Sequence, residues 1–325
     1  MPANASPVID IRAFENGDAK TRQIIAEQVD AICQSTGFLA ITNHGISAET
    51  TTNLWQSVQQ FFDLSIGQKQ QSKILHPGYP YGYMSNESET LGASIGNQTP
   101  PDLKETFNGG PQHTPTGVTD LDALGFCYAP TPWPSQPLLF KASWIKYYEA
   151  MEALAQRIMQ LFAVALKLSP NFFDSYIDTP ISALRAINYP PQSRAPQKDQ
   201  LRAGAHSDYG TLTILWPQDD SSGLEIQLQD GTWQEVAPIA GAFIINIGDL
   251  MQRWTNNRWR STVHRVTNPA RHDPASRRQS IAYFHQPNWD AVIKCLTDTE
   301  PLHEPTTSGP YLMSKFKSTV SQKDK

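Results

Sequence analysis

The feature that most constrains the fold is a change of hydrophobic period after Ala183. Beyond that residue, seven short segments carry apolar residues at about every second position, which indicates β-strands. Turn residues separate the segments and no helical pattern intervenes, as in antiparallel sandwiches and barrels. We therefore expect a β core in the C-terminal half. Its predicted strands are 184–189, 211–216, 224–229, 232–236, 243–247, 262–266 and 280–285.

Proline content supports short strands joined by turns. The chain has 25 prolines against 19 glycines, and each proline interrupts a helix or a strand ladder. Helical bundles and solenoids are therefore disfavoured. Asp230-Gly231 stands between two predicted strands and is a strong signal for a two-residue hairpin.

The N-terminal half is mainly helical by pattern. Ile25, Val29 and Ile32 recur at helical spacing after the capping residue Asp18, and Ser47 can cap a second helix. Residues 66–132 show no steady period, and either a packed surface loop or a wall of a substrate pocket fits them. The predicted fold class is α+β, with helices flanking the β core. The predicted elements of this half are helices over 22–32, after Ser47 and over 134–168, and a strand over 38–42.

Composition excludes several classes of protein. The chain of 325 residues is 39% hydrophobic, which is too apolar for a disordered protein, and it has no apolar run long enough to span a membrane. A net charge of −5 without a Lys/Arg run disfavours a nucleic-acid partner, and no protein partner is indicated. No secretory signal is visible. Because the three cysteines are scattered, we expect reduced thiols and a cytoplasmic protein.

Three short motifs carry the chemistry. In Gly-Ala-His-Ser-Asp-Tyr-Gly, His206 and Asp208 are two residues apart, so on an extended chain they share a face and can chelate a divalent metal. In Ser-Thr-Val-His-Arg-Val, His264 can complete two histidines and one carboxylate, the facial triad of non-haem Fe(II) oxygenases. In Arg-Gln-Ser, Arg278 and Ser280 share a strand face and can hold a carboxylate. Each motif alone is weak, because a buried core histidine or a surface arginine is commoner.

Taken together, the motifs resemble the isopenicillin N synthase-like family of Fe(II)/2-oxoglutarate-dependent dioxygenases. Gly37-Phe38 through Asn43-His44-Gly45, Ile187-Asn188-Tyr189-Pro190-Pro191 and Asn246-Ile247-Gly248-Asp249 are similar to further family segments. The resemblance covers about residues 7–300. It implies a double-stranded β-helix, that is, a cupin-like jelly roll. Because the metal ligands, the cosubstrate residues and the pocket candidates draw on both halves of the chain, we expect one oxygenase domain over 1–325, with a helical and loop region (1–182), a jelly-roll core with the metal site (183–290) and a C-terminal segment (291–325).

The resemblance also implies the cofactors and their residues. His206, Asp208 and His264 would bind Fe(II), and the cosubstrate 2-oxoglutarate would bind through its distal carboxylate to Arg278 and Ser280. Tyr189 matches a tyrosine that reaches the cosubstrate in some members. Dioxygen is the second cosubstrate, ascorbate can serve as reductant in vitro, and no catalytic residue is expected beyond the metal centre.

The expected reaction is oxidation of a small molecule, with release of succinate and carbon dioxide. Hydroxylation is the default, with desaturation or cyclisation as alternatives. Halogenation is disfavoured, because it would require a small residue in place of Asp208. An iron-dependent oxidase that does not use 2-oxoglutarate, or a jelly-roll binding protein without catalysis, stays open.

The substrate is not specified by the sequence, and an amino acid, a peptide-like intermediate or an aromatic or terpenoid metabolite would each fit. Arg185, four residues before Tyr189 on the same strand face, can meet a substrate carboxylate or pair with an acid. Aromatic residues of both halves can line the pocket. The pocket candidates are Tyr81, Tyr83, Phe107, Arg185, Tyr209, Phe284 and Trp289.

Overall fold

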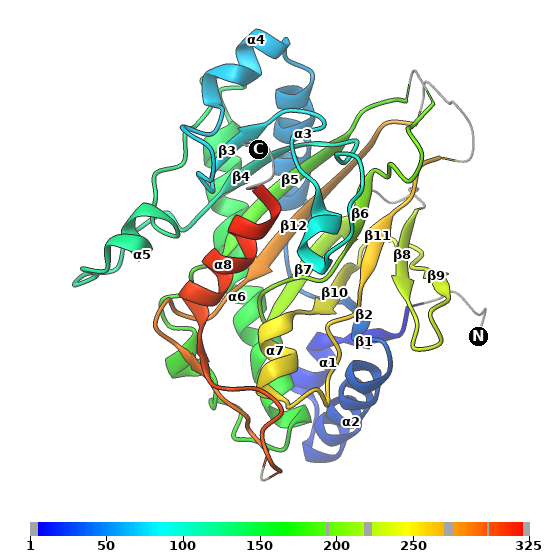
Figure 1. Ribbon diagram of the computed structural model, residues 1–325. Coiled ribbons are helices and arrows are strands. Elements are labelled where there is room, and N and C mark those ends of the chain that lie inside the picture. The colour runs from blue at the N-terminus through cyan, green and yellow to red at the C-terminus, as the bar shows by residue number, and fades with distance from the viewer. Residues whose placement is uncertain (1–5, 193–194, 218–222, 270–275, 298, 321–325) are drawn as a thin grey trace.

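Two facing β-sheets form the centre of the computed structural model, which describes residues 6–192, 195–217, 223–269, 276–297 and 299–320 (Figure 1). Several neighbouring strands come from distant parts of the sequence, and all strand pairs are antiparallel except the first strand, Val8–Asp10, with Phe38–Thr42. The larger sheet runs in the order β1 (Val8–Asp10), β2 (Phe38–Thr42), β10 (Phe243–Ile247), β7 (Leu212–Pro217), β12 (Arg278–His285), β5 (Ala183–Tyr189), β4 (Glu105–Gly109) and β3 (Gly82–Met84). The smaller sheet runs in the order β6 (Ala203–His206), β11 (His264–Val266), β8 (Leu224–Gln227) and β9 (Trp233–Glu235).

Both faces of the larger sheet are buried. On β10, Phe243 and Ile245 pack into the cluster shared with the helices, whereas Ile244 packs into the cluster between the two sheets. The period of two thus divides each central strand between a helix-facing side and a side that faces the smaller sheet. The predicted jelly-roll fold is confirmed, and the site lies on the side between the sheets.

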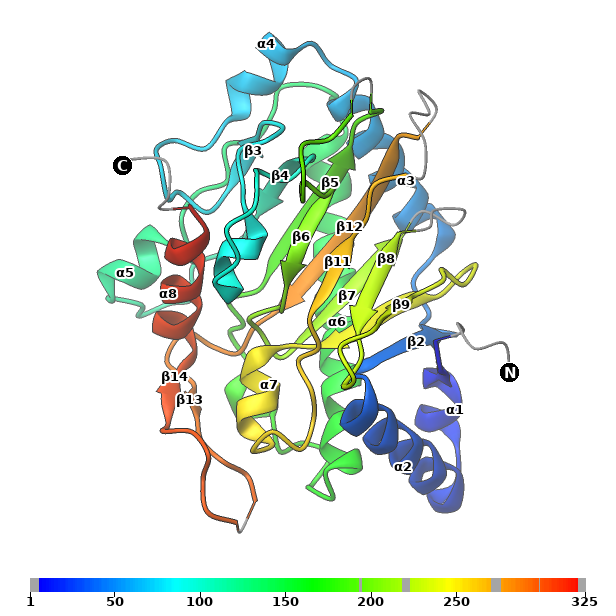
Figure 2. The ribbon, with the colours of Figure 1, turned by 45° about the vertical axis from the view of Figure 1, so that its right-hand side comes forward.

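A helical layer covers the outer face of the larger sheet. The long helix α6 (Phe140–Ala165) contacts β12 and β7, and α2 (Ala19–Ser35) and α3 (Ala48–Phe62) pack against it (Figure 2). Asp18 and Ser47 accept hydrogen bonds from Thr21 N and Thr50 N, which confirms both predicted N-caps. The other helices are α1 (Ile11–Asn16), α4 (Ile66–Lys69), α5 (Leu121–Gly125), α7 (Asp249–Trp254) and α8 (Ser308–Val320), with 3-10 turns at Gln70–Ser72 (η1), Leu91–Ile95 (η2) and Asp174–Tyr176 (η3).

Five helices and strands near the site were not predicted. Strands β3 and β4 come from the aperiodic stretch 66–132 and extend the larger sheet beyond β5. Strand β6 ends at His206, helix α7 interrupts the run of strands, and α8 lies beside α5 (Figure 1). A two-stranded ribbon, β13 (Val292–Ile293) and β14 (Thr306–Thr307), leads into α8. Among the described residues, no helix combines the length and apolarity needed to cross a bilayer.

A buried histidine makes stability depend on pH. His285 on β12 is 1% exposed, its Nδ1 lies 2.6 Å from Thr211 Oγ1, and burial lowers its pKa to about 3. The unfolded chain therefore takes up a proton as the pH falls through about 6.5, whereas the folded chain does so only near its own lower pKa. Stability contributed by the neutral ring is complete above about pH 6.5 and is lost below it.

We expect His285→Asn to flatten this dependence. Between about pH 7.5 and about pH 5, the free energy of unfolding of the wild type should fall by about 2 kcal/mol more than that of the variant. Urea titrations at several pH values measure the difference. His113→Asn, at an exposed position, is the matched control and should keep the wild-type slope. Parallel curves for wild type and His285→Asn would contradict the prediction.

Candidate metal centre and adjoining pocket

Two histidines from neighbouring strands face each other in the smaller sheet. His206 ends β6 and His264 begins β11, and the two residues are direct partners in the antiparallel pair. Asp208 follows β6, and its Oδ1 lies 3.9 Å from His206 Nε2 and 3.7 Å from His264 Nε2. One potential ligand atom from each of the three residues lies within 4.8 Å of the others. The arrangement can bind one metal ion from adjacent corners.

Backbone carbonyls orient both imidazoles. His206 Nδ1 lies 2.8 Å from the Gly204 carbonyl oxygen, and His264 Nδ1 lies 3.0 Å from that of Thr262. Because a carbonyl only accepts, each Nδ1 carries the proton and donates it. In the neutral form of this tautomer, Nε2 has the free lone pair that a metal ligand requires, and in both rings Nε2 lies toward Asp208.

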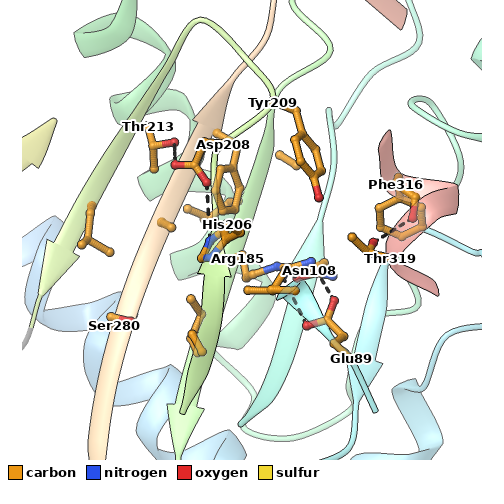
Figure 3. A pocket seen from close by; sticks show the side chains of 18 of the residues that line it. Glu89, Asn108, Arg185, His206, Asp208, Tyr209, Thr213, Ser280, Phe316 and Thr319 are labelled. Carbon is orange, nitrogen blue, oxygen red and sulfur yellow. Dashed lines mark hydrogen bonds and ion pairs between the residues drawn. The ribbon is translucent and has the colours of Figure 1, made fainter. Parts of the chain in front are cut away.

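Two side chains among the described residues donate hydrogen bonds to the same oxygen of Asp208. Thr213 Oγ1 donates to its Oδ2 at 2.5 Å, and Asn246 Nδ2 donates to the same oxygen at 2.7 Å. The other oxygen, Oδ1, is the one that faces the histidines (Figure 3). Burial alone would raise the pKa of Asp208, but the two histidines and these donors hold it below its usual value. Burial and His264 lower the pKa of His206. A carboxylate flanked by two imidazole nitrogens suits a divalent cation.

Close backbone contact shapes the turn that carries Asp208. A Cβ atom on Gly210 would lie 2.3 Å from the His285 carbonyl oxygen, and one on Gly248 would lie 2.3 Å from that of Gly210. Asp249 N donates to the Asp208 carbonyl at 2.8 Å. Glycine at both positions lets β7, β10 and β12 meet beneath the metal residues.

A second group of polar residues lies where β5 and β12 pair. Arg278 is opposite Tyr189 and Ser280 is opposite Ile187, and Arg278, Ser280 and Tyr189 are at most 3% exposed. The Arg278 guanidinium lies 5.0 Å from the centre of the Tyr189 ring. Arg202, just before β6, lies 5.9 Å from the same ring, and burial together with Arg278 lowers its pKa. Two neighbouring cations and a hydroxyl can bind a dicarboxylate.

One pocket of about 180 Å³ is lined by the three metal residues and by Tyr189, Arg278 and Ser280. Among the pocket candidates from the sequence, Tyr81, Arg185, Tyr209 and Phe284 line it. In Figure 3, Arg185 and Tyr209 lie to one side of His206 and Ser280 lies to the other. The pocket is lined by strands of both sheets and by α8.

Three candidates from the sequence lie outside this lining. Tyr83 donates to Glu105 Oε2 at 2.5 Å in a buried polar cluster. Phe107 packs among Phe61, Phe140 and Trp144 on the helical side of the sheet. Trp289 packs near α8, with its Nε1 3.0 Å from Asp120 Oδ2. All three therefore have structural partners.

Comparison with known proteins identifies the family. A family model for the 2OG-Fe(II) oxygenase superfamily matches residues 180–287, and one for the "non-haem dioxygenase in morphine synthesis N-terminal" matches residues 6–136. A validamycin A dioxygenase of Streptomyces hygroscopicus subsp. limoneus is 31% identical, over 88% of this chain and 78% of its own. The chain belongs to the 2OG-Fe(II) oxygenase superfamily.

Other relatives agree with this membership. The 2-oxoglutarate-dependent dioxygenase citB of Monascus ruber is 34% identical, over 89% of this chain and 87% of its own. A full-length Neurospora crassa protein, solved in complex with alpha-KG and thymine, is 27% identical, with a TM-score of 0.83, and the match covers 97% of this chain and 98% of its own. This chain is accordingly an Fe(II)- and 2-oxoglutarate-dependent dioxygenase, and its donor set of two imidazoles and one carboxylate fits Fe(II).

Sequence reasoning missed several residues of this oxygenase site. Several of them pair with a residue far away in the chain, as Glu89 does with Arg185, whereas Thr213 pairs with Asp208 only five residues before it. For Asn246, the Asn-Ile-Gly-Asp segment was a usable signal, because it precedes the turn that packs on Asp208. The residues missed at or near the site are Glu89, Lys104, Asn108, Phe126, Arg202, Thr213, Asn246, Leu312, Phe316 and Thr319.

Removing the donors to Asp208 should weaken metal binding. We expect Thr213→Val and Asn246→Ala each to lower Fe(II) affinity about 10- to 100-fold, because Oδ2 loses a bond that orients the carboxylate. Anaerobic Fe(II) titration measures the change. Thr211→Val is the matched control, since its buried hydroxyl bonds to His285 and not to Asp208. Unchanged affinity in both test variants would contradict the prediction.

Proposed function

We propose that this chain hydroxylates a small organic molecule. In the balanced reaction, dioxygen supplies one atom to the new C–OH group and one to succinate, and 2-oxoglutarate loses carbon dioxide. The observation that carries the proposal is that the His206, Asp208 and His264 side chains share one pocket with Arg278 and Ser280. The carboxylate of Asp208 fills the position that halogenation would leave open, which favours hydroxylation.

The proposal assigns a role to each of these side chains. His206 Nε2, His264 Nε2 and Asp208 Oδ1 would hold Fe(II), and Arg278, Ser280 and Tyr189 would hold 2-oxoglutarate. The bound iron supplies dioxygen activation coupled to decarboxylation of the cosubstrate. The chain orients the donors through Gly204, Thr262, Thr213 and Asn246. Its apolar walls exclude water and position the substrate carbon.

Substrate class, location and domain organisation complete the proposal. A small-molecule substrate is supported by the size of the pocket and by the thymine complex of the Neurospora crassa protein. A single oxygenase domain over 1–325 is supported by a pocket whose lining extends from Phe38 to Thr319. A cytoplasmic location is supported by three free thiols, at Cys33, Cys127 and Cys295.

The test is the stoichiometry of the reaction. Purified chain with Fe(II), ascorbate, 2-oxoglutarate and a library of small molecules should form succinate, with one oxygen atom from ¹⁸O₂ in the succinate and one in the product. Dioxygen uptake that does not require 2-oxoglutarate would contradict the proposal and indicate an oxidase. The absence of any iron-dependent dioxygen uptake would also contradict it and indicate a binding protein.

A further inference from the structure

A cluster of charged and polar side chains closes one end of the pocket. Its members, here called the Glu89 cluster, are Glu89, Asp102, Lys104, Asn108 and Arg185, from the β3–β4 segment, β4 and β5. In Figure 3, Glu89, Asn108 and Arg185 lie on the opposite side of His206 from Ser280. A substrate lying over the metal residues would therefore have Ser280 toward one end and Glu89, Asn108 and Arg185 toward the other.

The charges of this cluster cancel. Arg185 Nη2 lies 3.2 Å from Glu89 Oε1, and Lys104 Nζ lies 3.5 Å from Glu89 Oε2 and 2.9 Å from Asp102 Oδ2. Burial opposes ionisation of Glu89, but Arg185 and Lys104 hold its pKa below the usual value. Burial likewise opposes the charge on Lys104, but Asp102 and Glu89 raise its pKa. Two cations and two carboxylates leave a net charge of zero.

The cosubstrate end of the site has the opposite character. There Arg202 is buried beside a second cation, Arg278, and the aromatic ring of Tyr189. The Arg202 Nε atom is buried and has no hydrogen-bond partner among the described residues. Two adjacent guanidinium groups suit a ligand with negative charge. The chain therefore builds a positive end for a carboxylate and a neutral end where the rest of the substrate must lie.

A substrate carboxylate at Arg185 would be poorly placed. It would approach Glu89, which is 7% exposed, and would lose its hydration without an unbalanced cation to replace it. A neutral group with both donors and acceptors would meet no such penalty. Arg185 Nε donates to Asn108 Oδ1 at 2.8 Å. Nη1 and Nη2 together carry four N–H groups, which is more than the two hydrogen bonds that they make to the oxygens of Glu89. Glu89 offers acceptor oxygens, and Tyr209 in Figure 3 adds a hydroxyl.

We propose that the Glu89 cluster recognises a neutral substrate group that both donates and accepts hydrogen bonds, namely a carboxamide, lactam or imide on an otherwise apolar molecule. The apolar part would pack against Phe284 and against Phe126, Leu312 and Phe316 near α8. This assignment rests on the proposed function, because it concerns the substrate of the same site. It gives Arg185 a role different from binding a carboxylate.

Matched pairs of probes test the assignment. We would titrate phenylacetamide and phenylacetate, 3-phenylpropanamide and 3-phenylpropanoate, and hexanamide and hexanoate into the anaerobic enzyme loaded with Fe(II) and 2-oxoglutarate. Calorimetry should show each amide binding at least about tenfold more tightly than its acid. Glu89→Gln leaves the cluster with one net positive charge and should reverse the order. The double variant Glu89→Gln/Arg185→Gln is neutral again and should restore preference for the amide.

The controls separate this assignment from the proposed function. Glu87→Gln removes an acid two residues away and should keep the wild-type order. Acids that bind the wild type as tightly as the amides, or no binding in either series, would overturn the assignment. An unchanged order of amide and acid affinities in a folded Glu89→Gln variant would also overturn it. If that variant does not fold, the comparison of amides with acids in the wild type decides alone. Hydroxylation is judged separately, by succinate formation and ¹⁸O incorporation.

Discussion

Replacing any one of His206, Asp208 and His264 by alanine should lower succinate formation by more than about 100-fold. The three donor atoms lie within 4.8 Å of one another, and a facial triad has no spare protein ligand to compensate for a loss. Residual affinity from two ligands would not hold the ion in place during turnover. Iron content after anaerobic loading and succinate formation under saturating 2-oxoglutarate measure the effect.

The matched control makes the same histidine-to-alanine change at a position away from the metal residues. His113→Ala deletes an exposed imidazole outside the pocket and should leave both readouts at the wild-type level. Circular dichroism of each variant separates metal loss from unfolding. A folded His206→Ala enzyme with wild-type iron content and turnover would contradict the assignment of His206 as an iron ligand.

The β core was predictable because short apolar segments, separated by turn residues, recur through the C-terminal half. In 243–247, Phe243 and Ile245 pack with the helices and Ile244 packs between the sheets. In 280–285, Ile281 and Tyr283 pack with the helices, whereas the even residues Ser280, Ala282 and Phe284 line the pocket. The period of two therefore reflects two different buried faces. The same parity places Arg185 and Tyr189 on the side of β5 that lines the pocket. Parity also places Arg278 and Ser280 together on the pocket side of β12.

Strands β3 and β4 were not predictable from local pattern, because buried polar pairs stabilise them. Glu105 on β4 accepts from Lys69 at 2.8 Å and from Asn188 at 2.8 Å, and both partners are far away in sequence. A charged residue in such a segment predicts an exposed loop, because charged side chains are rarely buried unless they are paired. Tertiary pairing, and not local preference, therefore determines these strands.

Because the sequence did not predict β4, it also did not show which residues of that strand face the pocket. This is why Phe107 was named as a pocket candidate. Phe107 faces the helices, whereas its neighbour Asn108 lines the pocket. A shift of one residue exchanges the two faces of a strand, so aromatic character alone could not place the side chain. Glu89 and Arg202 were missed for a related reason, because their partners Arg185, Tyr189 and Arg278 lie in other segments of the chain.

Replacing Arg278 should separate cosubstrate binding from metal binding. We expect Arg278→Met to raise the KM for 2-oxoglutarate about 10- to 100-fold, because a charge-assisted hydrogen bond contributes about 1.5–3 kcal/mol. The methionine keeps most of the aliphatic length beside Tyr189, whose ring lies 5.0 Å from the guanidinium. Ser280→Ala removes one neutral donor and should raise the same KM less, by about tenfold or below. Initial rates of succinate formation against 2-oxoglutarate concentration measure both.

The neighbouring arginine supplies a matched control. Arg277 precedes Arg278 in sequence, but its Nε donates to Asn188 Oδ1 at 2.8 Å and its Nη1 pairs with Asp63, outside the pocket. Arg277→Met should therefore leave the KM for 2-oxoglutarate unchanged, even where it lowers stability. Fe(II) affinity should stay at the wild-type value in Arg278→Met, since this side chain is not a ligand. Equal KM changes in Arg277→Met and Arg278→Met would mean that net charge acts at long range, and not that Arg278 binds a carboxylate directly.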